Sequence, residues 1–324
     1  MDRLVLAVIA VVGVPLAICG YIVFGEKAIG LLPSRTQRAV RPWLWLFPAV
    51  VLLLLFLVYP TIQTIKLSLY GPQSKTFVGL RNYVAMFGDE TILLALRNNV
   101  IWLVVFTAVT VTLGLIFAFL ADRVRYESVA KAIVFLPMAI SFVGAGVIWK
   151  FVYAFRPAGS PQIGTLDAVF VAVIPSFQPQ AWLVNPPLNN LALIAVAVWV
   201  WTGFCTVILS AALKGISRDV LEAARVDGAN EWHVFRFVVI PMISGTIAVV
   251  TTTMIIFALK AFDIVYVMTS GNFGTDVMAN RMYTEMFNND DFGRAAAIAV
   301  ILLIAIVPIM LGNVRSFRRQ EEAR

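Results

Sequence analysis

The chain has 324 residues, of which 60% are apolar and only 13% are charged, and its mean hydropathy is +0.89. A soluble domain has about 45–50% apolar and about 25% charged residues, so this chain has too little polar surface to enclose its own core in water. The composition therefore excludes an ordinary soluble domain and predicts a membrane protein. The net charge of +7 is spread between apolar segments, as in positively charged loops beside a membrane, which argues against a nucleic-acid-binding domain.

Seven uncharged stretches are long enough, or nearly so, to cross a hydrocarbon core of about 30 Å as helices. In chain order they cover residues 4–24, 42–65, 101–121, 132–149, 191–212, 237–259 and 295–312. A shorter apolar run at 166–175 leads into a proline-rich stretch and is typical of a surface or interfacial segment. We expect an all-α, polytopic fold with about seven transmembrane helices.

The first stretch has two interpretations. Residues 16–19 faintly resemble a lipoprotein cleavage site, but Ile18 is bulky where such sites have a small residue, and Asp2 offsets Arg3 where a signal sequence has a basic cluster. A retained span is therefore favoured over a signal sequence. The two cysteines, Cys19 and Cys205, lie inside apolar runs and are expected to be small buried hydrophobic residues without chemistry of their own.

The distribution of basic residues predicts the direction of the spans. With the N-terminus outside and the C-terminus inside, the cytoplasmic segments carry 15 lysines and arginines against six in the outer segments. Cytoplasmic loops carry an excess of these residues, so this orientation is favoured.

The loop at 214–241 predicts a helix, a turn and a second helix on the cytoplasmic surface. Asp219 and Glu222 are typical of a helix N-terminus, Gly228 suits the turn, and Asn230 is a favourable N-cap for a helix that runs to about residue 240. On physical grounds a docking element and a solvated connector are about equally favoured, because exposed amphipathic helices are common.

A neutral solute that carries hydroxyl groups would need hydrogen-bonding groups beside apolar faces, and the fifth and sixth spans with the loop after them offer both. The candidates for a substrate pathway are Trp199, Trp201, Lys260, Asp263, Tyr266 and Asn272. Packing is the commoner role for each aromatic residue. Lys260 and Asp263 are three positions apart, so a local ion pair is favoured over a polar rim of the pathway.

The loop also matches a long spaced motif. Its residues resemble the EAA-x3-G-x9-I-x-L-P signature of ABC importer permeases, with Val238 and Ile240 where the signature has Ile and Leu. The matching positions are Glu222, Ala223, Ala224, Gly228 and Pro241. Segments 77–83, 222–230 and 262–269 are similar to maltose-type carbohydrate permeases, and 135–144 and 291–300 look closest to the α-glucoside branch.

This resemblance implies the architecture of a type I ABC importer permease. Residues 1–41 would form an extra N-terminal helix and a cytoplasmic linker, 42–314 the permease core with its coupling loop at 214–241, and 315–324 a basic cytoplasmic tail. The resemblance implies that Glu222, Ala223, Ala224, Asp227, Gly228 and Pro241 couple the chain to an ATPase.

The resemblance also implies the partners: a second, non-identical permease, two cytoplasmic ATPase subunits and an extracytoplasmic sugar-binding protein in a bacterial or archaeal plasma membrane. The chain lacks the G-x-x-x-x-G-K-[ST] phosphate-binding loop, so ATP and Mg²⁺ are expected on the ATPase. His233, the one histidine, has no evident ligand set or nucleophile beside it, so we expect no catalytic or metal site. The alternatives are an ion-coupled secondary transporter, an intramembrane enzyme and an ABC permease for a non-sugar solute.

Overall fold

The computed structural model describes residues 3–174 and 176–322. The chain divides into two compact units, Met1–Lys66 and Leu67–Arg324. The described residues are helical apart from their connections, and within them a single isolated bridge joins Tyr70 to Phe77.

The first unit is a helical hairpin. Its helices are α1 (Arg3–Gly30), α2 (Ser34–Leu53), a π-helical turn (Leu54–Val58) and α3 (Tyr59–Leu67). The hydroxyl of Tyr21 donates to the carbonyl of Leu44 at 2.7 Å, and Arg41 pairs with Glu26 at 2.9 Å. The expected linker before residue 42 is therefore largely helical and breaks only at residues 31–33.

The second unit begins with a short helix and then a 32-residue helical stretch, Glu90–Ala121. Its helices are α4 (Arg81–Phe87), α5 (Glu90–Ile101), the π-helical turn η2 (Trp102–Phe106), α6 (Thr107–Ala121), α7 (Glu127–Phe135), the 3-10 turn η3 (Leu136–Ala139), α8 (Phe142–Val152), α9 (Thr165–Val173), α10 (Leu188–Lys214), α11 (Arg218–Val226), α12 (Glu231–His233), the π-helical turn η4 (Val234–Val239), α13 (Ile240–Met242), α14 (Ser244–Leu259), α15 (Asp263–Thr269), α16 (Met278–Phe287) and α17 (Phe292–Glu322).

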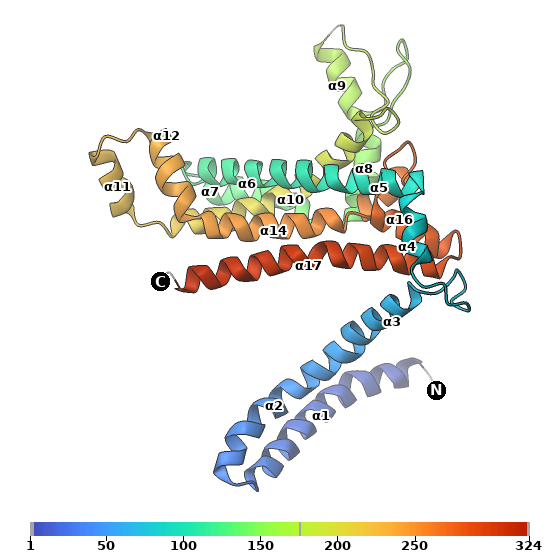
Figure 1. The fold of residues 1–324 in the computed structure, drawn as a ribbon. Coiled ribbons are helices and arrows are strands. Elements are labelled where there is room, and N and C mark those ends of the chain that lie inside the picture. Colours follow the sequence, from blue (N-terminus) through green and yellow to red (C-terminus); the bar gives the residue numbers. More distant parts are fainter. Residues whose placement is uncertain (1–2, 175, 323–324) are drawn as a thin grey trace. The chain divides into compact units, whose positions relative to one another are not determined.

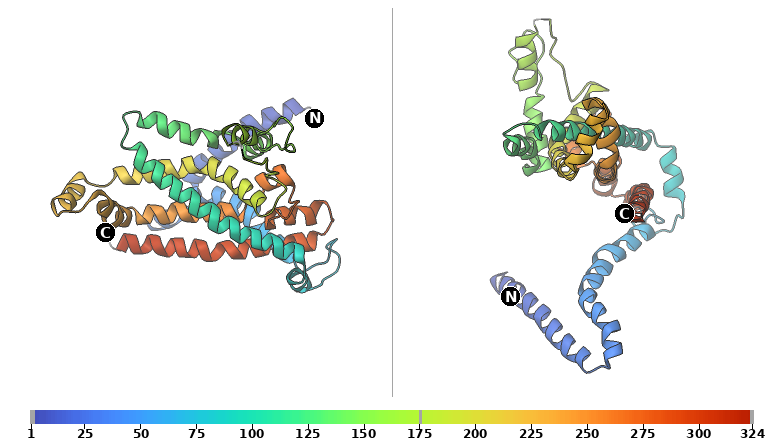
Figure 2. Two further views of the ribbon diagram at one scale, coloured as in Figure 1. Left: turned by 90° about the horizontal axis from the view of Figure 1, so that it is seen from above. Right: turned by 90° about the vertical axis from the view of Figure 1, so that its left-hand side faces the viewer.

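The most buried helix, α10, lies at the centre of the second unit. It packs against α6, α7 and α14, and α17 lies along α14 (Figures 1 and 2). Leu193, Val196 and Leu209 of α10 are fully buried, with Met254 of α14 in the same core. Figure 1 shows α11 and α12 at one end of this bundle and α4 and α16 at the other, and we call these the α11 end and the α16 end.

Five helices are long and apolar enough to cross a membrane, and the number rises to seven if each of two bent helix pairs is one span. This confirms the expected seven. The fourth expected span bends by 99° between Ala139 and Phe142, and the sixth bends by 70° between Met242 and Ser244. The sixth span was expected to start at residue 237 within one helix, but Ile243 leaves helical geometry and α14 begins at Ser244.

The cysteines differ in environment. Cys205 is fully buried in the core, as expected, whereas Cys19 is exposed in this chain. The expectation of a buried residue is therefore wrong for Cys19 within the structure described, because α1 has only one neighbouring helix, α2, in its unit.

Candidate functional site

The predicted helix-turn-helix forms at the α11 end of the bundle. The hydroxyl of Ser217 caps α11 by accepting from the backbone N–H of Asp219, so the helix begins at Arg218, one position before the expected Asp219. Gly228 has a φ of +86°, a conformation that favours glycine, and so closes the turn as expected. Asn230 accepts from the N–H of His233 at 2.9 Å and caps the second helix, which confirms its predicted role.

The motif residues of this loop are open to the surroundings. Glu222, Ala223 and Asp227 are exposed, Ala224 is half-buried, and no residue of α11 is buried. Val226 is 86% exposed and Val220 is 40% exposed, so α11 also presents apolar side chains that this chain does not cover. The small side chains at positions 223 and 224 leave its backbone accessible to a second surface.

Pro241 lies in the last turn before the bend of the sixth span. It is exposed, and its carbonyl accepts from the hydroxyl of Ser244 at 2.7 Å. The motif therefore ends where the chain turns from the surface segment into α14. The helix that Asn230 caps runs through α12, η4 and α13, a little further than expected.

Three of the pathway candidates meet at a second break in the sixth span. Helix α14 ends at Leu259, α15 begins at Asp263, and Phe262 between them has an irregular backbone (φ −141°, ψ −63°). Lys260, Asp263 and Trp201 line a cavity of about 60 Å³. Aromatic side chains surround it, namely Trp102, Phe106, Phe142, Phe257 and Phe262.

The expected ion pair between Lys260 and Asp263 does not form among the described residues. The expectation assumed a continuous helix, in which residues three positions apart are neighbours. Because the helix ends at Leu259, that spacing no longer holds. Both side chains are exposed in the isolated chain, so their charges are open to a partner or to water.

Two asparagines of α5 hold the segments around this break. The Nδ2 atom of Asn99 lies 3.5 Å from the carbonyl oxygens of Ala258 and Leu259, and its Oδ1 accepts from the N–H of Met278 at 2.7 Å. Asn98 donates to the carbonyls of Gly274 and Asp276, both at 2.8 Å. Both asparagines are buried, so these bonds form in a site shielded from water.

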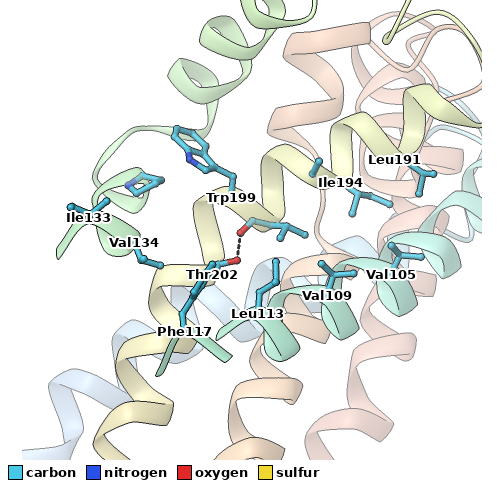
Figure 3. A pocket seen from close by; sticks show the side chains of 13 residues that line it. Val105, Val109, Leu113, Phe117, Ile133, Val134, Leu191, Ile194, Trp199 and Thr202 are labelled. Atoms are coloured by element: carbon cyan, nitrogen blue, oxygen red, sulfur yellow. Dashed lines mark hydrogen bonds between the residues drawn. The ribbon is translucent and has the colours of Figure 1, made fainter. Parts of the chain in front are cut away.

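Trp201 and Trp199 belong to different sites. Two helical positions correspond to about 200° around the axis, so the two rings leave α10 on nearly opposite sides. The ring of Trp201 lies 3.7 Å from that of Phe257, centre to centre, beside the small cavity. Trp199 instead lines a groove of about 610 Å³ between α6, α7 and α10 (Figure 3).

The groove beside Trp199 is apolar almost throughout. Its polar lining groups are the indole N–H of Trp199 and the hydroxyl of Thr202, and that hydroxyl already donates to the carbonyl of Val198 at 2.6 Å (Figure 3). Sugar hydroxyls buried there would lose their hydrogen bonds, at a cost of about 1–3 kcal/mol each. The groove has the volume for a ligand but not the chemistry for a sugar.

The last two pathway candidates also separate. Tyr266 stacks on Phe262, with ring centres 5.2 Å apart, and so adjoins the small cavity. The side chain of Asn272 donates to the carbonyl of Thr269 at 2.9 Å within a turn after α15. Its amide stabilises that turn, so the structure does not bring it together with Trp201.

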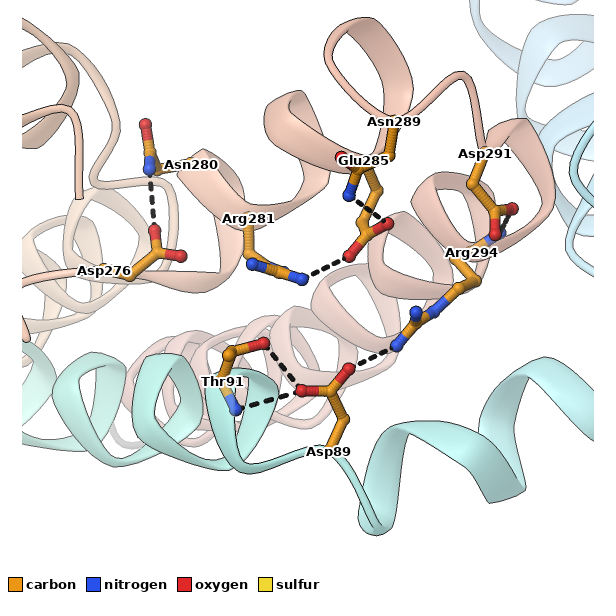
Figure 4. A network of polar contacts seen from close by, with 9 residues as sticks. All are labelled: Asp89, Thr91, Asp276, Asn280, Arg281, Glu285, Asn289, Asp291 and Arg294. Carbon is orange, nitrogen blue, oxygen red and sulfur yellow. Dashed lines mark hydrogen bonds and ion pairs between the residues drawn. The ribbon is translucent and has the colours of Figure 1, made fainter. Parts of the chain in front are cut away.

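A network of charged residues fixes the α16 end of the bundle (Figure 4). Arg281 pairs with Glu285 at 2.6 Å, and Arg294 of α17 pairs with Asp89 at 2.5 Å. Asp89 also caps α5 by accepting from the N–H of Thr91. The network joins α5, α16 and α17 beside the loop that Asn98 holds.

The described residues offer no group of three or more His, Cys, Asp and Glu side chains that could hold a metal ion. His233 is exposed, and its Nδ1 atom lies 2.8 Å from Oδ1 of Asn230. It is thus a surface residue at a helix start, as the sequence favoured.

Sequence reasoning named Trp201 and Tyr266 but missed the other aromatic residues around Lys260 and the asparagines beside the break. The missing information is tertiary: Asn99 and Leu259 are 160 positions apart, and no periodicity relates them. The sequence did contain one sign of these contacts: Asn98 and Asn99 stand at the start of an apolar run, and amides buried there need hydrogen-bond partners elsewhere in the chain.

Comparisons with known proteins agree with this architecture. Residues 110–320 match the family described as binding-protein-dependent transport system inner membrane component. The osmoprotective compounds uptake permease protein of Synechocystis is 57% identical over 281 residues, covering 87% of this chain and 100% of that protein. The alpha-glucoside transport system permease protein of Rhizobium meliloti is 46% identical over 334 residues, covering 99% of each.

Solved structures share the fold. A bacterial ABC transporter involved in the import of the acidic polysaccharide alginate contains a chain with a TM-score of 0.74 and 21% identity, covering 88% of this chain and 99% of that one. The same transporter in complex with an alginate pentasaccharide-bound periplasmic protein gives a TM-score of 0.75 at 20% identity, covering 88% of this chain and 98% of that one. The chain described here belongs to the family of binding-protein-dependent transport system inner membrane components.

Proposed function

We propose that the chain is a transmembrane permease subunit of an ATP-driven sugar importer that takes up an α-glucoside or a related oligosaccharide. Two relatives support this: an alpha-glucoside permease that matches nearly the whole chain, and a more distant lactose permease with 30% identity over 282 residues. Membership of a binding-protein-dependent family also favours this function over an ion-coupled secondary transporter.

The observation that carries the proposal is that no residue of α11 is buried in its own chain. This helix bears the EAA motif and lies at one end of the bundle. We assign it the docking of an ATPase, with Glu222 as the charged contact, Ala223 and Ala224 as the close-packing face, and Asp227 and Gly228 as the turn. Pro241 ends the surface segment through which a displacement of α11 would reach α14.

The partner, rather than this chain, would use ATP and Mg²⁺. The sequence has no phosphate-binding loop, so this chain would not hydrolyse ATP itself. ATP binding to the ATPase would change its contacts with α11, and that difference in contact free energy would shift the permease between inward-open and outward-open states.

The complete importer would contain a second, non-identical permease, two ATPase subunits and an extracytoplasmic sugar-binding protein. The periplasmic protein in the related alginate transporter supports the last of these. The size of the cavity beside Lys260 supports the second permease: about 60 Å³ is far below the roughly 300–1,000 Å³ of ordinary ligand sites. Another subunit or another conformation must complete a sugar site there.

Within that site, Trp201 and Tyr266 would offer ring faces, and Lys260 and Asp263 would offer a donor and an acceptor to sugar hydroxyls. The α11 end would face the cytoplasm of a bacterial or archaeal cell, and the chain would cross the plasma membrane several times with its N-terminus outside. The excess of basic residues in the loops on the α11 side supports this orientation.

Reconstitution of the complete transporter tests the proposal. The chain is co-expressed with the second permease, the ATPase and the binding protein that the proposal requires, and uptake of maltose, trehalose and sucrose into vesicles is measured. We expect uptake of at least one sugar only when ATP is present. Uptake driven by an ion gradient without ATP, or ATP-driven uptake of amino acids or phosphate but of no sugar, contradicts the proposal.

A further inference from the structure

The connections of α11 to the bundle are short and contain glycine at each side. Residues 215–217 join it to α10, and residues 227–230 join it to α12, with Gly215 in the first link and Gly228 at a φ of +86° in the second. Glycine resists backbone rotation least of all residues. Rigid transfer of movement from α11 to the spans therefore needs side-chain contacts in addition to these two backbone links.

Glu231, the first residue of α12, makes such a contact on two sides. Its Oε1 atom accepts from Nε of Arg225 on α11 at 2.8 Å, and its Oε2 atom accepts from a terminal guanidinium nitrogen of Arg123 at 3.1 Å. Arg123 follows the C-terminal end of α6, 108 positions earlier in the chain. One carboxylate thus joins α11, α12 and the end of α6 through charge-assisted hydrogen bonds.

Aromatic packing supports the same contact. The guanidinium of Arg123 lies 4.0 Å from the ring centre of Phe119 on α6, and the ring of Phe119 lies 4.9 Å from that of Phe235 in η4. Cation–π attraction restricts the guanidinium of Arg123 and so helps to aim it at Glu231. The hydrogen bond with Glu231 also raises the pKa of Arg225 above its ordinary value.

The space around these side chains is otherwise poorly filled. A cavity of about 210 Å³ lies between α6, α11 and η4, and another of about 320 Å³ lies between α6 and α12. Phe119, Arg123, Glu231 and Phe235 line both cavities. These four side chains therefore bridge the space between α6 and the α11–α12 loop. Because the backbones do not pack closely there, a displacement of α11 could reach α6 only through such side chains.

We propose that Glu231 is a positioning residue that links Arg225 of α11 to Arg123 of α6, so that a displacement of α11 moves α6 together with α10 and α14. This inference rests on the proposed function, because it assigns a mechanical role to the ATPase-coupling loop. It concerns the transfer of movement inside the permease, whereas Glu222 concerns the contact with the ATPase.

The test uses the complete transporter in vesicles and compares sugar uptake with ATP hydrolysis. Loss of an exposed ion pair changes an equilibrium by roughly two- to fivefold. We expect Arg123→Gln to lower the uptake per ATP hydrolysed by about that factor while ATPase activity and co-purification of the ATPase persist. Arg123→Lys should restore part of the uptake, because it keeps the positive charge.

Two further variants make the test specific. Glu231→Gln should match Arg123→Gln, and the double variant should be no worse than the poorer single one, because both changes remove the same contact. Arg236→Gln is the matched control: Arg236 is exposed on the same segment and lies over the ring of Phe237 without a carboxylate partner among the described residues. Arg236→Gln should leave the uptake per ATP hydrolysed unchanged.

The outcomes separate the two proposals. Wild-type vesicles that fail to couple sugar uptake to ATP contradict the proposed function and this inference with it. A coupled wild type in which Arg123→Gln behaves like Arg236→Gln, or in which the effects of Arg123→Gln and Glu231→Gln multiply, contradicts the positioning role alone. Parallel loss of uptake and ATPase activity at a constant ratio also contradicts it.

Discussion

Gly203 of α10 lies against the main chain of Val134 in α7. A Cβ atom added at Gly203 would lie 2.4 Å from the carbonyl oxygen of Val134 and 2.5 Å from the Cα atom of Phe135. These are backbone atoms, which cannot rotate away as a side chain can. The absence of a side chain at Gly203 therefore allows α7 and α10 to pack closely.

Replacing Gly203 with alanine should therefore destabilise the protein. The added methyl group must push α7 and α10 apart, and overpacking of this kind costs about 1–3 kcal/mol. Thermal unfolding of the detergent-solubilised protein measures the effect. Gly312→Ala is the control, because a Cβ atom there meets no heavy atom within 4 Å. Equal melting temperatures for the two variants would contradict the close approach.

The sequence predicted the parts of the fold that depend on local rules. The apolar runs located the spans, and the capping residues located the turn at Gly228 and the helix start at Asn230. Thr252 and Thr253 of the sixth span also bond locally, by donating to the carbonyls of Ala248 and Val249 four positions earlier. Each of these features is decided by neighbours within four positions.

The features that sequence reasoning missed depend on distant residues. The break after Leu259 interrupts the helix between Lys260 and Asp263. Asn99, whose side chain contacts the carbonyl of Leu259, lies on another span. Hydropathy gave no sign of it, because an apolar run looks the same whether or not the helix continues. Trp199 and Trp201 were named by residue type alone, and their directions around α10 place them beside different cavities.

Glu222→Lys should weaken docking of the ATPase and lower sugar uptake strongly while the permease still inserts in the membrane. The reversed charge would lie at an exposed surface, so the fold should be unaffected, whereas truncating or reversing a docking charge costs about 2–5 kcal/mol in binding. Co-purification of the ATPase and uptake into vesicles are the measurements. Glu90→Lys, a matching change at an exposed residue near the α16 end, should leave co-purification and uptake intact. Unchanged docking of the ATPase in Glu222→Lys would refute the role of Glu222.

Trp201→Phe should raise the KM for sugar uptake, and Trp199→Phe should not. The first ring adjoins the cavity with Lys260 and Asp263, and the second lines the apolar groove. Loss of part of an aromatic contact corresponds to about 0.5–1.5 kcal/mol, or roughly a two- to tenfold change in KM. Phenylalanine keeps an aromatic ring in the core and limits the effect on folding. An equal rise in both variants would argue against the separation of the two sites.

Lys260 and Asp263 should contribute independently to stability. Since they form no ion pair in the structure described, a double-mutant cycle with Lys260→Met and Asp263→Asn should give a coupling energy below about 0.5 kcal/mol. Lys131 and Glu127 provide the comparison, because they form an ion pair at the start of α7 and should couple measurably. A Lys260–Asp263 coupling as large as that of the comparison pair would restore the ion-pair interpretation.

The contact of Asp89 with Arg294 should make stability depend on pH in a defined direction. Burial raises the pKa of Asp89, but hydrogen bonds from Thr91 and Arg294 outweigh it and lower the pKa from its ordinary value of 3.8 to about 2. A carboxylate with a lowered pKa stabilises the fold at pH values above its ordinary pKa, and this contribution disappears as the pH falls through about 2.

Asp89→Asn keeps a capping side chain but loses the charge, so it should destabilise the protein by roughly 1 kcal/mol at neutral pH. Melting temperatures of the variant and the wild type should differ by a constant amount down to about pH 4 and converge between about pH 4 and pH 2, because Asp89 is then protonated in the wild type too. Asp290→Asn, which removes an exposed carboxylate that has no ion pair among the described residues, should show no such difference. A difference between Asp89→Asn and the wild type that widens on acidification would mean that the carboxylate is held in its neutral form by burial, with Arg294 contributing little.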